Sequence, residues 1–311
     1  MKLSPNLLGR FGRRKSWDDV IFDTINTLFM IFLCTVMLYP LLNTLAISLN
    51  DANDSIRGGI GLIPREFTWY NYQHVFGEAA ILQAGLISIL RTVIGTALSV
   101  FCTAMVAYTI SRQYFVLRRF MTIAFVLTMY FNGGLIPTYL LMRELNLIGT
   151  FWIYVIPGII GVFNLIVIRS FIDGLPESIF ESARIDGAGE WTMFFKIALP
   201  LSLPVIATVS LFVAVFQWNS WFDVFLYNSA QPHLSTLQYE LMKILQNSNA
   251  SLTARSAADV FASGQGGGAN IVTPTSIRAA MTIVVSVPII MVYPFLQKYF
   301  VKGLTLGGVK G

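Results

Sequence analysis

Long apolar stretches alternate with short polar segments over most of the chain. Six such stretches cover residues 24–50, 79–110, 120–142, 145–168, 197–222 and 279–297. Each has roughly the 20 residues that a helix needs to cross the hydrocarbon of a bilayer. Their apolar residues are not confined to one helical stripe, as expected where lipid and protein core are both apolar. The pattern predicts an all-α membrane protein with six transmembrane helices.

Prolines lie within or near five of these stretches, at Pro40, Pro137, Pro157, Pro204 and Pro288. Neighbouring helices in a membrane bundle can satisfy the carbonyl groups that a proline leaves without a donor. We therefore expect kinks rather than breaks at these positions.

Composition agrees with the hydropathy pattern. The 311 residues are 55% hydrophobic and 12% charged, with a mean hydropathy of +0.66, which excludes an ordinary soluble protein. The net charge of +5 comes from basic residues that flank apolar stretches, as topology signals do, so nucleic-acid binding is not expected. Cys34 and Cys102 both fall inside predicted spans, and the sequence holds no Cys/His spacing typical of a metal site.

The distribution of basic residues predicts the orientation in the membrane. With the amino terminus inside, 14 of the 21 Lys and Arg residues fall in cytoplasmic segments and 6 in external ones, while Arg91 lies within the second span. This bias favours two cytoplasmic termini. Residues 1–19 are then a cytoplasmic arm, 20–300 the transmembrane domain and 301–311 a cytoplasmic tail. The long segments 51–78 and 228–277 are external, and 237–252 within the second could form a surface helix.

The cytoplasmic loop 174–199 has its own pattern. Pro176 suits the first turn of a helix, because its missing N–H would have no partner there. Ile179, Phe180 and Ala183 form one apolar face, and Gly187 can take the positive φ that ends a helix. A second short helix is expected from about Glu190. Read alone, the loop could be an amphipathic helix lying on lipid or a docking element for a partner.

The same loop carries a specific resemblance. Glu181, Ala183 and Gly187, followed by Ile197, Leu199 and Pro200, resemble the EAA motif of ATP-binding-cassette importer permeases; the small residue Ser182 replaces its second position. Further stretches, Phe131–Tyr139, Trp218–Asp223 and Lys302–Gly311, are similar to the second permease of oligosaccharide importers. The resemblance covers nearly the whole chain. It implies the type I importer fold and a permease in a bacterial plasma membrane.

The resemblance also implies partners. The loop would hold the coupling helix, which docks in a cleft of an ATPase subunit, with Glu181, Ser182, Ala183, Asp186, Gly187 and Glu190 as its coupling residues. The working unit would contain a homologous second permease, two ATPase copies and an extracellular sugar-binding protein. This chain has no Walker A sequence, so ATP and Mg²⁺ would bind the ATPase and no cofactor would bind here.

Polar residues at membrane depth are candidates for the sugar path, because they usually face a bundle interior or a cavity. Amides and carboxylates can bind sugar hydroxyls, and indoles can stack on pyranose rings. The candidates are Asn132, Gly133, Gln217, Trp218, Asn219, Trp221 and Asp223. Two structural roles compete with this one: an interfacial aromatic belt for the tryptophans and helix–helix hydrogen bonding for Asn132. Arg91 is expected to pair within the bundle or to extend outward.

Other functions fit less well. An intramembrane enzyme needs a catalytic constellation at membrane depth, but Asp223 stands alone and no H-E-x-x-H sequence or Ser/His pair occurs in the spans, so no catalytic residues are assigned. A channel would not explain the Glu181 loop, and the spans offer no ring of like charges. A permease for a non-sugar solute stays open as an alternative. The sequence does not name the sugar.

Overall fold

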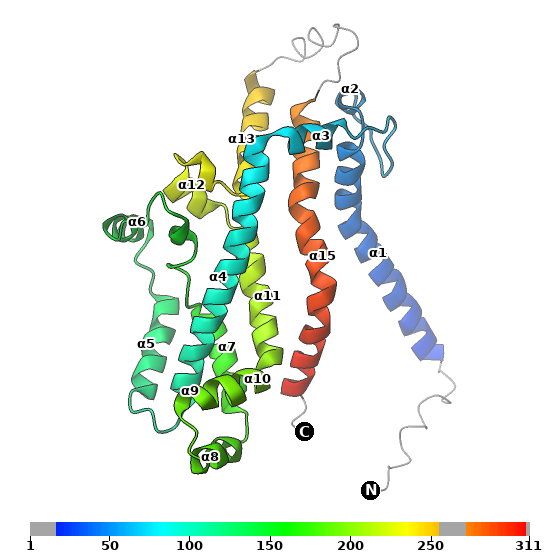
Figure 1. The fold of residues 1–311 in the computed structure, drawn as a ribbon. Helices are drawn as coiled ribbons and strands as arrows, with labels where there is room; N and C mark the ends of the chain where they lie inside the picture. The colour runs from blue at the N-terminus through cyan, green and yellow to red at the C-terminus, as the bar shows by residue number, and fades with distance from the viewer. Residues whose placement is uncertain (1–16, 255–271, 309–311) are drawn as a thin grey trace.

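The computed structural model describes the backbone of residues 17–254 and 272–308, where the regular secondary structure is helical (Figure 1). Their one β-type pairing is an isolated antiparallel bridge between Asn50 and Phe67. Much of the predicted amino-terminal arm and the last residues of the tail lie outside the described residues. The all-α prediction is confirmed for the part of the chain that the structure covers.

Three long helices form the upright frame of the molecule (Figure 1): α1 (Trp17–Ser48), α4 (Ala79–Ser111) and α15 (Pro274–Gly308). Each contains a segment long and apolar enough to cross a membrane. They correspond to the first, second and sixth predicted spans. α4 packs against α7 (Val162–Asp173) and α11 (Leu203–Asn219), and α1 packs against α15. α4 is therefore the central helix of the bundle.

The third predicted span, 120–142, is not one helix. α5 (Arg118–Tyr130) and α6 (Leu135–Glu144) meet at an angle of 120°. Gly134 at the bend has a φ of 89°, a conformation that only glycine adopts without strain, and its N–H donates to the side-chain oxygen of Asn132 at 2.8 Å. The bend thus lies at the Asn132–Gly134 interruption that the sequence displays, but it is a sharp turn and not a kink at Pro137.

The fourth predicted span, 145–168, is also wrong as a single helix. A 3₁₀ turn, η2 (Phe151–Tyr154), is followed by irregular backbone, and α7 begins only at Val162. Pro157, Gly158 and Gly161 fall in the irregular part. Proline removes a hydrogen-bond donor and glycine raises the entropic cost of a helix, so this segment breaks where we expected a kink.

The fifth predicted span, 197–222, contains a second strong bend. α9 (Glu190–Met193), a π-helical turn at Phe194–Ala198 and α10 (Leu199–Leu201) lie at 79° to α11. Pro200 and Pro204 flank the bend, and neither can donate a backbone hydrogen bond. Among the described residues, three helices can span a membrane, or up to five if each bent pair is one crossing. The chain is a multi-pass membrane protein.

Four helices lie toward the end of the bundle opposite α8 (Glu177–Ile185) (Figure 1): α2 (Ala52–Ile56), α3 (Tyr70–Gly77), α12 (Phe222–Asn228) and α13 (Leu237–Ala254). A 3₁₀ turn, η4 (Pro232–Leu234), lies between α12 and α13 in the sequence. The surface helix expected within 237–252 is confirmed as α13. In the segment before α3, the buried carboxylate of Asp54 accepts hydrogen bonds from Asn50 and Arg65, both at 2.9 Å. These contacts, that of Asn50 first, lower the pKa of Asp54.

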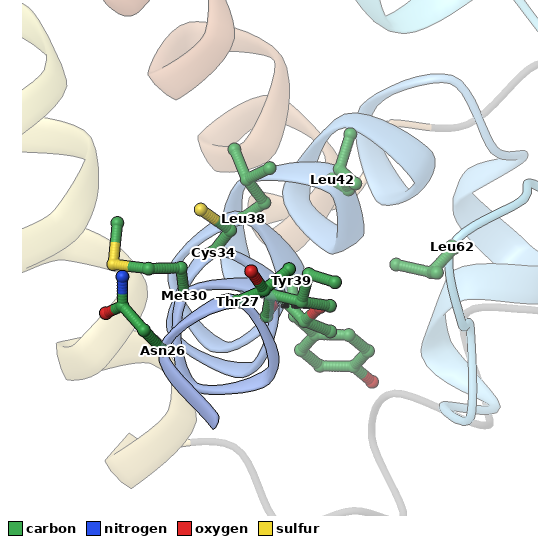
Figure 2. A pocket seen from close by; sticks show the side chains of 10 residues that line it. Asn26, Thr27, Met30, Cys34, Leu38, Tyr39, Leu42 and Leu62 are labelled. Carbon is green, nitrogen blue, oxygen red and sulfur yellow. Dashed lines mark hydrogen bonds between the residues drawn. The ribbon is translucent and has the colours of Figure 1, made fainter. Parts of the chain in front are cut away.

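The first helix is mostly uncovered. From Trp17 to Leu42 most of its apolar side chains are exposed, and α1 diverges from α15 toward its amino-terminal end (Figure 1). Its exposed side and Leu62 of the following segment border a cavity of about 500 Å³ (Figure 2). An apolar surface of this extent is unfavourable in water, so we expect lipid or another protein to cover it.

Candidate functional site

The loop 174–199, which we call the coupling loop after the role that the EAA resemblance implies, contains α8 (Glu177–Ile185), which is preceded by Pro176 and ends in a Schellman motif. The N–H of Gly187 donates to the carbonyl of Arg184 at 3.1 Å, and the N–H of Ala188 donates to that of Ala183 at 2.9 Å. Gly187 has a φ of 78°, as the motif requires. The predicted helix, its start and its glycine stop are confirmed, and so is a second helix that begins at Glu190.

One side of α8 is fixed to the base of α4. Phe180 is completely buried, with its ring centroid 6.3 Å from that of Tyr108. The guanidinium of Arg112, directly after α4, lies 4.0 Å from the centroid of Phe180 and 3.5 Å from a carboxylate oxygen of Glu177. The Tyr108 hydroxyl donates to Glu190 at 2.9 Å, which ties α9 to the same place. Both short helices are thus held by residues at the end of one long helix.

The opposite side of the loop is open. Of the six predicted coupling residues, Ala183 is half-buried, whereas the other five are exposed: Glu181, Ser182, Asp186, Gly187 and Glu190. Two large apolar side chains are exposed beside them, Ile185 at 86% and Trp191 at 65%. The surface therefore combines carboxylates with uncovered apolar groups, which is what a docking face for another protein requires.

The edge of this surface has its own electrostatics. Burial raises the pKa of Tyr114 above its ordinary value, and hydrogen bonding to Glu190 adds to the effect. The guanidinium of Arg184 lies 4.7 Å from the ring centroid of Tyr114. Arg184 and Tyr114 therefore pack on the exposed side of the loop, whereas Arg112 contacts its buried side.

A second polar group lies inside the bundle around Arg91, which is 1% exposed. Its guanidinium pairs with both carboxylate oxygens of Asp223, one of them at 3.1 Å, and donates to the side-chain oxygen of Gln217 at 2.8 Å. It also lies 4.7 Å from the ring centroid of Tyr154. We call Arg91, Gln217, Asp223, Tyr154 and Asn228 the outer polar cluster. The expectation that Arg91 pairs within the bundle is confirmed.

Tyr154 and Asn228 extend the outer polar cluster into the neighbouring loops. The Tyr154 hydroxyl donates to the carbonyl of Leu234 at 2.8 Å and accepts from the Asn228 amide at 2.7 Å. Asn228 also accepts from the N–H of Gly149 at 2.8 Å. Four separate segments are therefore joined by buried polar contacts, each worth more in a low-dielectric interior than at the surface.

The remaining candidates for the sugar path are dispersed. Trp218 is 8% exposed and donates its indole N–H to the carbonyl of Val285 on α15 at 3.0 Å. Asn219 is exposed and accepts from Gln238, and Trp221 is half-buried beside Phe222. Asn132 and Gly133 lie in the exposed bend between α5 and α6. Their shared role in the sugar path stays a prediction.

The described residues offer no grouping of His, Cys, Asp and Glu that could hold a metal ion. Sequence reasoning missed Tyr154, Asn228 and Gly95 of α4. A Cβ on Gly95 would lie 2.8 Å from the amide nitrogen of Gln217, so this glycine makes room for the outer polar cluster. The available signal was weak, because single polar residues and glycines inside apolar stretches are common in membrane helices.

Comparison with known proteins places this architecture. The family model for binding-protein-dependent transport system inner membrane components matches residues 88–306. The chain belongs to this family. The permease is 35% identical over 293 residues to the polygalacturonan/rhamnogalacturonan transport system permease protein YtcP of Bacillus subtilis (strain 168), covering 94% of this chain and 99% of that protein.

Two further likenesses support the assignment. The permease is 29% identical over 300 residues to the arabinooligosaccharides transport system permease protein AraQ of Halalkalibacterium halodurans, covering 94% and 98% of the two chains. Its fold matches a chain of a bacterial ABC transporter involved in the import of the acidic polysaccharide alginate, with a TM-score of 0.82, 26% identity and coverage of 93% and 100%. The type I permease fold expected from the EAA motif is confirmed.

Proposed function

We propose that this permease forms the membrane path of an ATP-driven oligosaccharide importer and is not itself catalytic. The observation that carries the proposal is the loop around α8, which is fixed to α4 on one side and exposes Glu181, Asp186 and Ile185 on the other. The relatives transport sugar polymers or oligosaccharides by name, which supports a carbohydrate substrate.

The proposed complex contains a homologous second permease, two ATPase subunits and an extracellular solute-binding protein. ATP and Mg²⁺ bind the ATPase subunits, and no cofactor binds this chain. ATP-driven closure of the ATPases moves residues 181–190, and the helices rock between inward-facing and outward-facing states. The exposed face of α1 is in contact with lipid or the second permease.

The proposed topology has six crossings of a bacterial plasma membrane, with residues 20–300 as the transmembrane domain and loop 174–199, the amino-terminal arm 1–19 and the tail 301–311 in the cytoplasm. In support, α1 begins and α15 ends at the end of the bundle where α8 lies (Figure 1). A reporter fused after residue 60 or 265 should be external, and one fused after residue 115 or 187 cytoplasmic. An external reporter at 187 would place the loop out of reach of an ATPase.

The proposed sugar path retains the candidates Asn132, Gly133, Gln217, Trp218, Asn219, Trp221 and Asp223. The structure suggests two different roles for these candidates. Gln217 and Asp223 are bound to Arg91 and act by shaping the path. Asn219 is exposed, with its amide bonded to Gln238 and Val215, and Trp221 is half-buried, so each can contact sugar from its open side. Alanine at Asn219 should then weaken transport without loss of protein from the membrane.

The deciding experiment uses the complex reconstituted in proteoliposomes with its ATPase and binding protein. ATP hydrolysis is measured with the binding protein loaded in turn with oligogalacturonides, neutral arabino-oligosaccharides and an amino-acid mixture. Stimulation by one of the sugars and none by the amino acids is the expected result. Stimulation by a non-sugar solute alone would replace the proposed substrate, and failure to retain any ATPase would overturn the proposed assembly.

A further inference from the structure

Arg112, next to the coupling loop, is buried in a way that is unusual for a cation. It is 3% exposed, although it lies at the end of a membrane helix next to the loop 113–117, where a cation could easily reach water. Burying a guanidinium is unfavourable unless close partners compensate for its lost hydration. Its position inside the protein therefore points to a specific task.

The partners of Arg112 belong to two different elements. Behind it are residues of α4: its Nε donates to the Ser111 hydroxyl at 3.1 Å, and its guanidinium lies 5.0 Å from the Tyr108 ring centroid. In front of it are residues of α8: the Phe180 ring at 4.0 Å and the Glu177 carboxylate at 3.5 Å. The guanidinium is thus placed between the base of α4 and the inner face of α8.

One nitrogen of the Arg112 guanidinium has no hydrogen-bond partner on α8. The Nη1 of Arg112 is buried and makes no hydrogen bond, because the Glu177 oxygen at 3.5 Å is an ion-pair partner without hydrogen-bond geometry. A buried donor without a partner is unfavourable, because it has lost its bonds to water and gained none in the protein. A small shift of α8 could complete or lengthen this contact, so its energy depends on where α8 lies relative to α4.

α4 can carry a displacement across the membrane. It is unbroken over 33 residues, or about 50 Å. The helix pairs α5–α6 and α10–α11, in contrast, are sharply bent. Arg91 of the outer polar cluster lies on α4, 21 residues or about 30 Å before Arg112. α4 also packs against η2, η4 and α13 at its outer end.

We propose that Arg112 is a positioning residue that transmits movement of α8 into α4, and through α4 to the outer polar cluster. The ring of Phe180 and the carboxylate of Glu177 form the receiving surface on α8. Because Arg112 lies on the inner side, it acts after the ATPase has docked and takes no part in docking. The proposal rests on the proposed function, since it assigns a task within ATP-driven transport.

The test compares Arg112→Met, Arg112→Lys and wild type in the reconstituted complex, with Arg119→Met as the matched control because Arg119 is exposed nearby. Three quantities are measured on equal amounts of assembled complex: ATPase retained, basal ATP hydrolysis, and sugar molecules transported per ATP. A residue that only supported the fold would change the amount of complex but leave the transport ratio unchanged.

For Arg112→Met we expect full retention of the ATPase, basal hydrolysis near the wild-type rate, and about a ten-fold loss of sugar transported per ATP. Arg112→Lys should recover part of the loss, because it keeps a cation near Glu177 and Phe180 but loses the planar fork. Arg119→Met should match wild type. A wild-type transport ratio in Arg112→Met, or loss of the ATPase in parallel with transport, would overturn the proposal.

Phe180→Leu is a second test of the proposal if Arg112→Met does not accumulate in the membrane. Leucine keeps an apolar side chain in place but removes the ring face beneath the guanidinium, so the same selective loss of coupling is expected. Unchanged coupling would overturn the role of Arg112. A wild-type complex that retained no ATPase would instead refute the proposed function, and the two failures are therefore distinguishable.

Discussion

The outer polar cluster and the coupling loop both concentrate polar residues, but they use them in opposite ways. In the outer polar cluster, Arg91 is buried and its guanidinium donates hydrogen bonds to Asp223 and Gln217. In the coupling loop, the carboxylates of Glu181 and Asp186 face outward beside exposed Ile185. A polar group that is satisfied internally holds a fold together, whereas one left open beside apolar surface is available to a partner.

The largest effect should come from breaking the ion pair of the outer polar cluster. Asp223→Ala leaves the Arg91 charge buried without its partner and should destabilise the permease by about 3–5 kcal/mol. Denaturation of the purified protein in detergent would measure this. Asp186→Ala, at the exposed end of α8, should change stability by no more than about 0.5 kcal/mol. Equal effects at the two sites would remove the distinction between them.

The second effect should appear in the coupling loop and concern uptake. Gly187→Ala places a side chain at a φ of 78°, which costs about 1–2 kcal/mol and loosens the end of α8. Gly189 has a φ of −75° and open space around it, so Gly189→Ala is a matched control that should be tolerated. We expect sugar uptake to fall several-fold in the first variant only. Equal uptake in both would show that the Schellman end does not shape the docking face.

A third effect should sharpen the account of the outer polar cluster. Gly95→Ala puts a methyl group 2.8 Å from Gln217 and should cost about 1–3 kcal/mol through overpacking. Gly85→Ala, on the same helix, meets Leu237 at an ordinary 3.8 Å and should be nearly neutral. The difference in unfolding midpoint between these two variants measures how tightly Gln217 is held.

The smallest effect should be a pH dependence at Asp54. Because folding lowers the pKa of Asp54, this carboxylate contributes stability above its unfolded pKa of about 3.9, and the contribution is lost as pH falls through the lower folded value. Asp54→Asn should therefore flatten the acid limb of the stability profile below about pH 4 and leave the slope near neutral pH unchanged. An unaltered acid limb would show that the hydrogen bonds from Asn50 and Arg65 do not stabilise the charged form.

The sequence predicted the coupling loop well because its signals are local. Pro176, the apolar Phe180 and the glycine at 187 specify the start, inner face and end of a short helix regardless of distant packing. The long spans were predicted less evenly. Hydropathy indicates where apolar residues lie, but it does not show that Gly134 turns the chain by 120° or that Pro157 and its glycines leave 155–161 irregular.

The outer polar cluster could not be predicted in full because its contacts are long-range. Arg91 and Asp223 are 132 residues apart, and Tyr154 and Asn228 are 74 apart. Gln217 and Asp223 were recognised as unusual for their membrane depth, but a single sequence does not show that the same arginine binds both. Their assignment to the sugar path stays a prediction, and it now competes with a defined structural role.

The central claim is that the exposed face of α8 docks the ATPase, and photo-crosslinking tests it most directly. Cys34 and Cys102 are first replaced by serine, and a single cysteine at Ile185 carries a benzophenone label, with Ile63 as a control of similar exposure, 77% against 86%. In the assembled, transport-active complex, the label at position 185 should crosslink to the ATPase and the label at position 63 should not. An active complex in which position 185 gives no ATPase crosslink, or in which position 63 does, would contradict the account.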